Sequence, residues 1–320
     1  MKRTALVALK IAVSIGLLVY LFANTDLEAL RQRIGRGDLL LLAAAVVLYL
    51  VMLGIATWRW RLLLEAQGFR ARMRPLSASY LVATFFNNFL PSNIGGDVIR
   101  VRDSSRLTGS TTTSLAVVAI DRILGFSALY VLAAIAYFAG SDEGRALAGA
   151  DTVVLALGPI FGGLAFVFFR PGIARAAMRF SRLDRVGWAR DRFLVVQAAV
   201  HVYRERVGHV WVAFGASVAL QALVVWYYYA IAHALSIPLP LSICFVMVPL
   251  CTLVQAVPIS FNGWGIRESL FIVYFRQIGL PSDNALAFSI VGAGLIVLLS
   301  LSGALVWLAR GEAAVTADAA

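Results

Sequence analysis

The sequence contains few charged residues. Only 14% of its 320 residues are Asp, Glu, Lys or Arg, while 61% are hydrophobic and the mean hydropathy is +0.84. A soluble globular domain carries roughly 25% charged residues, so the composition excludes that class. The only cysteines, Cys244 and Cys251, show no Cys-x-x-Cys spacing, and the three histidines are scattered. The sequence therefore indicates neither a disulfide framework nor a metal-ligand cluster.

Motifs of soluble and membrane-bound enzymes are also missing. No Gly-x4-Gly-Lys-Ser/Thr loop occurs, so nothing indicates nucleotide binding. An enzyme that acts on a lipid phosphate would need an acidic metal motif or a nucleophilic histidine. Asp97 and Asp103 lie six residues apart with no third acid nearby. We therefore expect no catalytic residue, no metal and no cofactor, and the protein is not expected to be an enzyme.

Long apolar runs recur along the chain, many of them 17 to 29 residues long and so able to cross the hydrocarbon core of a bilayer. They predict an all-α polytopic membrane protein with about six to eight transmembrane helices plus two re-entrant hairpins. The first run follows a basic start without a convincing cleavage site, so we read it as a retained helix rather than a signal peptide. The runs cover residues 5–23, 38–57, 76–90, 112–140, 152–169, 210–235, 241–257, 269–274 and 284–309.

The net charge of +11 is concentrated in blocks between the apolar runs, which argues against a nucleic-acid partner. One block covers residues 58–74, and another covers 170–206 with nine arginines. The positive-inside rule places both in the cytoplasm of a multi-pass protein of the cell (inner) membrane. The N-terminus is then cytoplasmic, and Arg310 favours a cytoplasmic C-terminus. Residues 171–207 form a basic amphipathic segment, expected to lie on anionic lipid or to dock a biosynthetic enzyme partner.

One run cannot cross the membrane. Three runs separate the two basic blocks, and three crossings would place the blocks on opposite sides. The run at 76–90 is short and leads into "NNFLPSNIGGDVIR", which is rich in helix breakers and ends in a basic stretch. We therefore predict a re-entrant hairpin at 76–100. Broken backbone at membrane depth requires burial in protein or a water-filled cavity.

A second broken segment, "VPISFNGWGIRES", repeats this pattern. In both segments a Pro is followed by Gly after five residues and by Arg after nine, namely Pro91, Gly96, Arg100 and Pro258, Gly263, Arg267. Three crossings lie between the copies, so the second hairpin, at 241–268, starts from the opposite face. This arrangement is typical of inverted-repeat transporters, whose site lies near the midplane. We therefore predict one domain over 1–320, with halves at 38–170 and 209–310.

These motifs also resemble a known family. The segment "LPSNIGGDVIR", a helix bearing "IDR", the basic mid-chain stretch and the late "VPISFNGWGIRE" are together similar to the lysylphosphatidylglycerol synthase transmembrane-region family, also described as flippase-like. The resemblance covers nearly the whole chain. It implies a module that moves a lipid between leaflets, which in the best-known members is an aminoacylated phospholipid made by a separate soluble domain. The chain ends ten residues after Arg310, so we expect a stand-alone module without the synthase domain.

Charged residues near the breaks are the main candidates for a substrate site. Ionisable groups within the membrane are costly and mark a pathway or an ion pair. Arg100 is expected to bind a lipid phosphate or carboxylate on the inner side, and Arg267, beside Glu268, on the outer side. Each arginine has a structural alternative, a position at the interface for Arg100 and pairing with Glu268 for Arg267. Asp97 could cap a helix, hold an arginine or contact a cationic head group.

The remaining candidates have two readings each. Asp121 and Arg122 lie about ten residues inside an apolar run, where a salt bridge to a hairpin is as good an interpretation as substrate contact. The asparagines can repair hydrogen bonds that the breaks leave open, and the glycines permit the hairpin geometry or bind an anion through backbone N–H groups. The predicted substrate-binding set is Asn87, Asn88, Pro91, Gly95, Gly96, Asp97, Arg100, Asp121, Arg122, Pro258, Asn262, Gly263, Arg267 and Glu268.

The leading functional hypothesis is a translocase for a phospholipid or lipid-linked head group, with a midplane cavity formed by the two hairpins. One alternative is a non-transporting scaffold for a lipid or cell-envelope biosynthetic enzyme. A membrane-embedded lipid-modifying enzyme is the third class. The expected partners are the membrane lipid itself, an anionic lipid surface and a biosynthetic enzyme.

Overall fold

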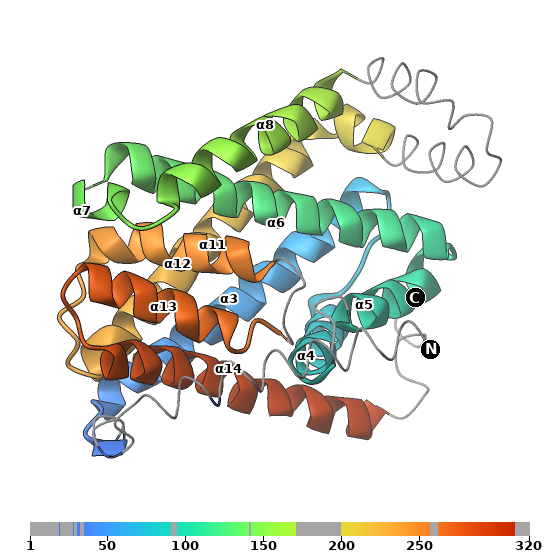
Figure 1. The fold of residues 1–320 in the computed structure, drawn as a ribbon. Helices are drawn as coiled ribbons and strands as arrows, with labels where there is room; N and C mark the ends of the chain where they lie inside the picture. The colour runs from blue at the N-terminus through green and yellow to red at the C-terminus, as the bar shows by residue number, and fades with distance from the viewer. Residues whose placement is uncertain are drawn as a thin grey trace, which may run out of the picture.

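The computed structural model describes residues 35–90, 95–140, 142–170, 200–256 and 262–310, and before them only Val19, Glu28, Arg31 and Gln32. Throughout these residues the chain is helical and contains no strand, which confirms the all-α fold (Figure 1). The first apolar run apart from Val19, most of the basic segment 171–207, Pro91 and Pro258 lie outside the described residues. The helices are α3 (Leu39–Ala66), α4 (Met73–Phe89), α5 (Gly95–Thr108), α6 (Thr111–Ala139), α7 (Asp142–Arg145), α8 (Ala150–Phe169), α11 (Val207–Ala234), α12 (Leu241–Gln255), α13 (Ile266–Gln277) and α14 (Ser282–Arg310).

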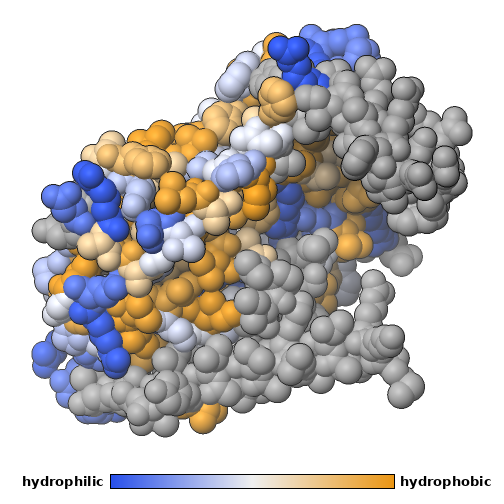
Figure 2. Space-filling model, turned by 45° about the horizontal axis from the view of Figure 1, so that its top comes forward, coloured by the Kyte–Doolittle hydropathy of each residue, from blue (hydrophilic) through white to orange (hydrophobic). Residues whose placement is uncertain are grey.

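Four of the described helices, α3, α6, α11 and α14, are long and apolar enough to cross a membrane. Each has 28 or 29 residues, or about 42 Å at 1.5 Å per residue, which exceeds the roughly 30 Å hydrocarbon core. Hydrophobic residues cover the middle of the face in Figure 2, while hydrophilic ones gather toward its ends. This is the surface of a multi-pass membrane protein.

The helices fall into two similar halves. The lengths of α3, α4, α5 and α6 are 28, 17, 14 and 29 residues, and those of α11, α12, α13 and α14 are 28, 15, 12 and 29. Packing follows the same pairing, because α3 packs on α11, α4 packs on α14, and α12 packs on α6. In each half, the first helix of the broken pair packs on the last helix of the other half, as expected for a pseudo-two-fold repeat.

The described part of the second break has left-handed backbone. Asn262, Gly263 and Gly265 have positive φ angles of 48°, 76° and 85°. Glycine adopts such angles freely, and Asn tolerates them better than most other residues. The chain then enters α13, which contains Ser269 to Tyr274 and continues past the predicted hairpin end at 268 to Gln277. Its 12 residues span about 18 Å, too short for a separate crossing.

Basic residues gather at one end of the bundle. Arg310, at the end of α14, donates from Nη2 to the Pro75 carbonyl at 2.9 Å and lies 3.6 Å from Asp103. Arg206, just before α11, donates to the carbonyl of Glu65 in the last turn of α3 at 2.9 Å. These contacts bring together the ends of α3, α4, α5, α11 and α14. We refer to this as the basic end.

Candidate functional site

A polar cavity of about 270 Å³ lies among α3, α4, α5, α6 and α11, with Thr252 of α12 at its wall. Its described lining residues are Arg59, Tyr80, Ala83, Thr84, Asn87, Asp97, Arg100, Asp121, Arg122, Gly125, Phe126, Leu129, Leu220, Gln221 and Thr252. Five of the predicted site residues meet here, namely Asn87, Asp97, Arg100, Asp121 and Arg122. Of the described residues of the second hairpin, only Thr252 lines the cavity, whereas six described residues of the first hairpin do.

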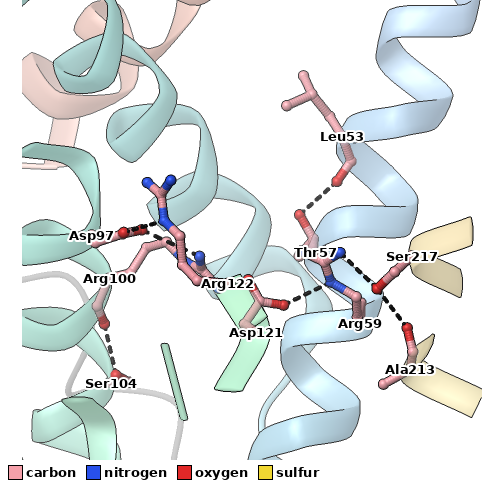
Figure 3. A network of polar contacts seen from close by, with 10 residues as sticks. All are labelled: Leu53, Thr57, Arg59, Asp97, Arg100, Ser104, Asp121, Arg122, Ala213 and Ser217. Atoms are coloured by element: carbon pink, nitrogen blue, oxygen red, sulfur yellow. Dashed lines mark hydrogen bonds and ion pairs between the residues drawn. The ribbon is translucent and has the colours of Figure 1, made fainter. Parts of the chain in front are cut away.

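Asp121 of α6 is the centre of the network in Figure 3. Its Oδ1 accepts from Nε of Arg59 at 2.7 Å, and its Oδ2 accepts from Nη2 of Arg100 at 2.9 Å. Arg59 also donates from Nη1 to the hydroxyl of Ser217 on α11 at 2.9 Å. Asp121 is 1% exposed. It therefore ties α6 to the first hairpin, as one reading of the sequence predicted, and to α3 as well.

Asp97, in the first turn of α5, connects two further arginines. Its Oδ2 accepts from Nε of Arg122 at 2.5 Å, and its Oδ1 lies 3.5 Å from Nη1 of Arg100. The Arg100 guanidinium also lies over two aromatic rings, 4.7 Å from the centroid of Trp60 and 5.1 Å from that of Tyr80. These cation–π contacts stabilise a charge that is only 4% exposed.

The charges around the cavity do not balance. Three arginines, Arg59, Arg100 and Arg122, face two carboxylates, Asp97 and Asp121, so the described lining has a net charge of +1. Nε of Arg100 is buried and has no hydrogen-bond partner among the described residues. Buried charges are normally paired, because an unpaired ion loses its hydration without compensation. The cavity is therefore complementary to a group with one negative charge.

Along the candidate spans, the cavity lies between the basic end and the middle of the helices. Arg59 is seven residues before the end of α3, or about 10 Å along the helix axis. Asp121 is ten residues from the start of α6, or about 15 Å. Ser217 lies equally far from the start of α11. An anion bound here would have left the aqueous surface at the basic end.

Asparagine and glycine hold the first break together. Gly96 donates its backbone N–H to Oδ1 of Asn87 at 2.8 Å. A Cβ at Gly96 would lie 2.0 Å from the carbonyl oxygen of Ala83, so only glycine allows α5 to pack this closely on α4. Asn88 accepts a hydrogen bond from Nδ2 of Asn262 at 3.2 Å, which joins the two breaks. These contacts fit the structural reading of the asparagines and glycines.

Arg267 and Glu268 form a separate cluster outside this cavity. Glu268 Oε1 accepts from Nη2 of Arg267 at 2.6 Å and from the hydroxyl of Ser289 on α14 at 2.8 Å. Its Oε2 accepts from the N–H of Gly265 at 2.6 Å. The Arg267 guanidinium also lies 4.8 Å from the ring centroid of Trp264. Arg267 holds the same place as Arg100 in the repeated Pro, Gly and Arg spacing, but its charge is neutralised by the neighbouring Glu268.

Sequence reasoning missed Arg59, which lies in the block 58–74 that is predicted to be cytoplasmic. The apolar run ends at Thr57, yet α3 continues to Ala66 and carries Arg59 within it. A signal was present in the helical periodicity, since Met52, Ala56, Arg59 and Leu63 are spaced by four, three and four residues and all are buried. Ser217 and Tyr80 carried no comparable signal. Among the described residues, no group of three or more His, Cys, Asp and Glu side chains is arranged to hold a metal.

Comparison with known proteins agrees with the sequence motifs. The family described as "Lysylphosphatidylglycerol synthase TM region" matches residues 7–303, which include both breaks and every residue of the polar cavity. No curated protein matches the chain. The family match extends over most of the 320 residues. The chain therefore belongs to the lysylphosphatidylglycerol synthase transmembrane-region family.

Proposed function

We propose that the protein is a lipid translocase that moves an anionic phospholipid, or a lipid-linked anionic head group, between leaflets. The observation that carries the proposal is the net charge of +1 in the polar cavity, together with the unpartnered Nε of the buried Arg100. A phosphodiester supplies one negative charge and several acceptor oxygens. Arginine is well suited to such a group because its planar fork can donate two parallel hydrogen bonds.

The arrangement of the arginines supports a binding site that can exchange partners. Asp121 bridges Arg59 and Arg100, so a phosphate that takes over the contact of Asp121 with Arg100 leaves Asp121 paired with Arg59. Asp97 likewise remains paired with Arg122 when Arg100 turns to the lipid. When Arg100 changes its partner from the carboxylates to the phosphate, no carboxylate is left unpaired in the membrane. The free-energy cost of this exchange is therefore low.

The charge distribution supports entry of the head group from the cytoplasmic leaflet. The positive-inside rule predicts that the basic end faces the cytoplasm. Lipids of the cytoplasmic leaflet would then reach the cavity near the first hairpin, with the acyl chains remaining in the bilayer. Exit on the other side would require the second hairpin to open, which is consistent with alternating access in inverted repeats.

The test is lipid translocation by the purified protein in liposomes. Head-group-labelled phosphatidylglycerol and phosphatidylcholine are compared, and a membrane-impermeant quencher reports the labelled lipid left in the outer leaflet. We expect phosphatidylglycerol to move faster in liposomes that contain the protein than in protein-free liposomes. Phosphatidylcholine should move more slowly than phosphatidylglycerol, because its positive choline group opposes the net charge of the cavity.

Two results would contradict the proposal. Movement of both lipids at equal rates would mean that the charge of the cavity does not select the head group. Movement of neither lipid would favour the scaffold, in which the cluster of arginines and acids only holds the helices together. A circular-dichroism and melting measurement on the same preparation ensures that the protein tested is folded.

A further inference from the structure

An apolar groove of about 380 Å³ lies between α6, α8 and α11, apart from the polar cavity. Of its described lining residues, only Ser127, Tyr130 and Trp211 bring polar side-chain atoms to it, and the Tyr130 hydroxyl donates to the carbonyl of Val154 at 3.2 Å. The groove is lined by Ile120, Ile123, Leu124, Ser127, Tyr130, Val131, Gly158, Phe161, Gly162, Ala165, Phe168, Val207, Val210, Trp211 and Phe214.

Small residues on α8 leave this groove open. Helix α8 has no counterpart in the described second half and lies along α6 at the edge of the bundle (Figure 1). Gly158 and Gly162 face the groove one turn apart. A Cβ at Gly162 would meet no heavy atom within 4 Å, so a side chain there would project into open space. Glycine lowers helix stability by about 1 kcal/mol relative to alanine, and here it preserves the groove.

The groove runs along two candidate membrane spans. Its residues on α6 and α11 lie between the first and sixth turns of these helices, so in a bilayer most of the groove would face the hydrocarbon core. In such surroundings the molecule that reaches the groove is a lipid, and the apolar lining favours its acyl chain. Trp211 and Phe161 provide wide apolar surfaces for contact with that chain.

One end of the groove carries positive charge. Phe168 lines the groove, and the guanidinium of Arg204 lies 5.6 Å from the centroid of its ring and donates to its backbone carbonyl. Arg170 follows two residues after Phe168 and is exposed. An acyl chain in the groove would therefore place its glycerol phosphate beside arginine at the basic end.

We propose that this groove binds one acyl chain of an anionic bilayer phospholipid, whose phosphate lies against Arg204. The site differs from the polar cavity, since α6 presents Ile120, Ile123 and Leu124 to the groove and Asp121 and Arg122 to the cavity. The bound lipid would contact both α8 and the helices α6 and α11, and so stabilise the packing of α8 on the bundle. Because this role is structural, it does not depend on whether the protein translocates lipid.

The test is photo-crosslinking in phosphatidylcholine nanodiscs with phosphatidylglycerol that carries a diazirine in one acyl chain. Crosslinked peptides are identified by mass spectrometry. We expect crosslinks at the groove, including Phe161 and Phe214. In Gly162→Leu, the new side chain displaces at least two methylenes of the lipid, each worth about fourfold in affinity, so the yield at low probe concentration should fall about tenfold or more.

Gly163→Leu is the matched control. Gly163 also has no atom within 4 Å of an added Cβ, but it does not line the groove. Both substitutions raise helix propensity equally, so a difference between them reports occupancy of the groove. Equal crosslinking in the two variants and the wild type would overturn the proposal. Arg204→Gln should lower the yield for phosphatidylglycerol but not for a matching phosphatidylcholine probe, and equal losses would overturn the assignment of the phosphate.

Discussion

Asn262 and Asn88 are 174 positions apart in the chain, yet Nδ2 of Asn262 donates a hydrogen bond to Oδ1 of Asn88 at 3.2 Å. Asn88 belongs to the last turn of α4, and Asn262 begins the described chain after the second break. The two interrupted segments of the repeat therefore meet. This hydrogen bond links the two interrupted segments directly, and the proposed alternating access would require such a link.

Substitution of Asn262 can separate its backbone role from its side-chain role. Asn262→Ala removes the hydrogen bond and forces alanine to adopt a φ of 48°, whereas Asn262→Gly removes only the hydrogen bond. We expect the alanine variant to lose about 1–2 kcal/mol more stability than the glycine variant, because a left-handed conformation costs that much for an L-residue. Thermal or denaturant unfolding in detergent checks this, and equal losses in both variants would contradict the backbone role.

Gly96 and Gly95 form a matched pair at the start of α5. A Cβ at Gly96 would press on the backbone of Ala83, whereas one at Gly95 would meet only the flexible side chain of Leu90, at 2.7 Å. We therefore expect Gly96→Ala to cost about 2–3 kcal/mol of stability through overpacking, and Gly95→Ala much less. Unfolding in detergent measures both. Similar values would mean that α4 and α5 do not require their close packing.

Much of the fold could be predicted from the sequence. Apolar runs located every described helix except α5 and α7, and the repeated Pro, Gly and Arg spacing located both breaks, since proline and glycine within an apolar run interrupt a membrane helix. The end of α3 could not be read from hydropathy, because Arg59 and Arg61 continue a helix whose apolar run ends at Thr57. Likewise, α13 could not be distinguished from a span until its length was known.

The residues of the candidate site were predicted in part. Asp97, Arg100, Asp121 and Arg122 were candidates, and they line one cavity; their binding of a substrate stays a prediction. The sequence could not show which charged residues pair with each other. An ionisable residue within an apolar run is recognised because its burial in the membrane is costly, but the sequence does not identify its partner. For the same reason, Arg267 and Glu268 were predicted to bind substrate on the same grounds as Arg100. In the structure they neutralise each other and lie away from the described cavity.

The Arg267–Glu268 pair should prove structural. Glu268→Gln keeps an acceptor for Gly265 but removes the charge that balances Arg267, which is 7% exposed. We expect a loss of about 3–5 kcal/mol, since breaking a buried pair leaves one uncompensated ion. The variant with both Arg267→Met and Glu268→Gln should be at least about 1 kcal/mol more stable than the sum of the single losses predicts. Additive losses would indicate that the two side chains act independently, as a substrate-binding arginine would.

The most direct test of the translocase compares Arg100→Gln with Arg102→Gln in the liposome assay with labelled phosphatidylglycerol. Both arginines are on α5, but Arg100 is buried in the cavity and Arg102 is exposed. We predict that Arg100→Gln lowers the translocation rate about tenfold or more, because a hydrogen bond to a charged group contributes ~1.5–3 kcal/mol, while Arg102→Gln leaves it nearly unchanged. Equal rates for the two folded variants would contradict the assignment of Arg100 as the residue that binds the anion.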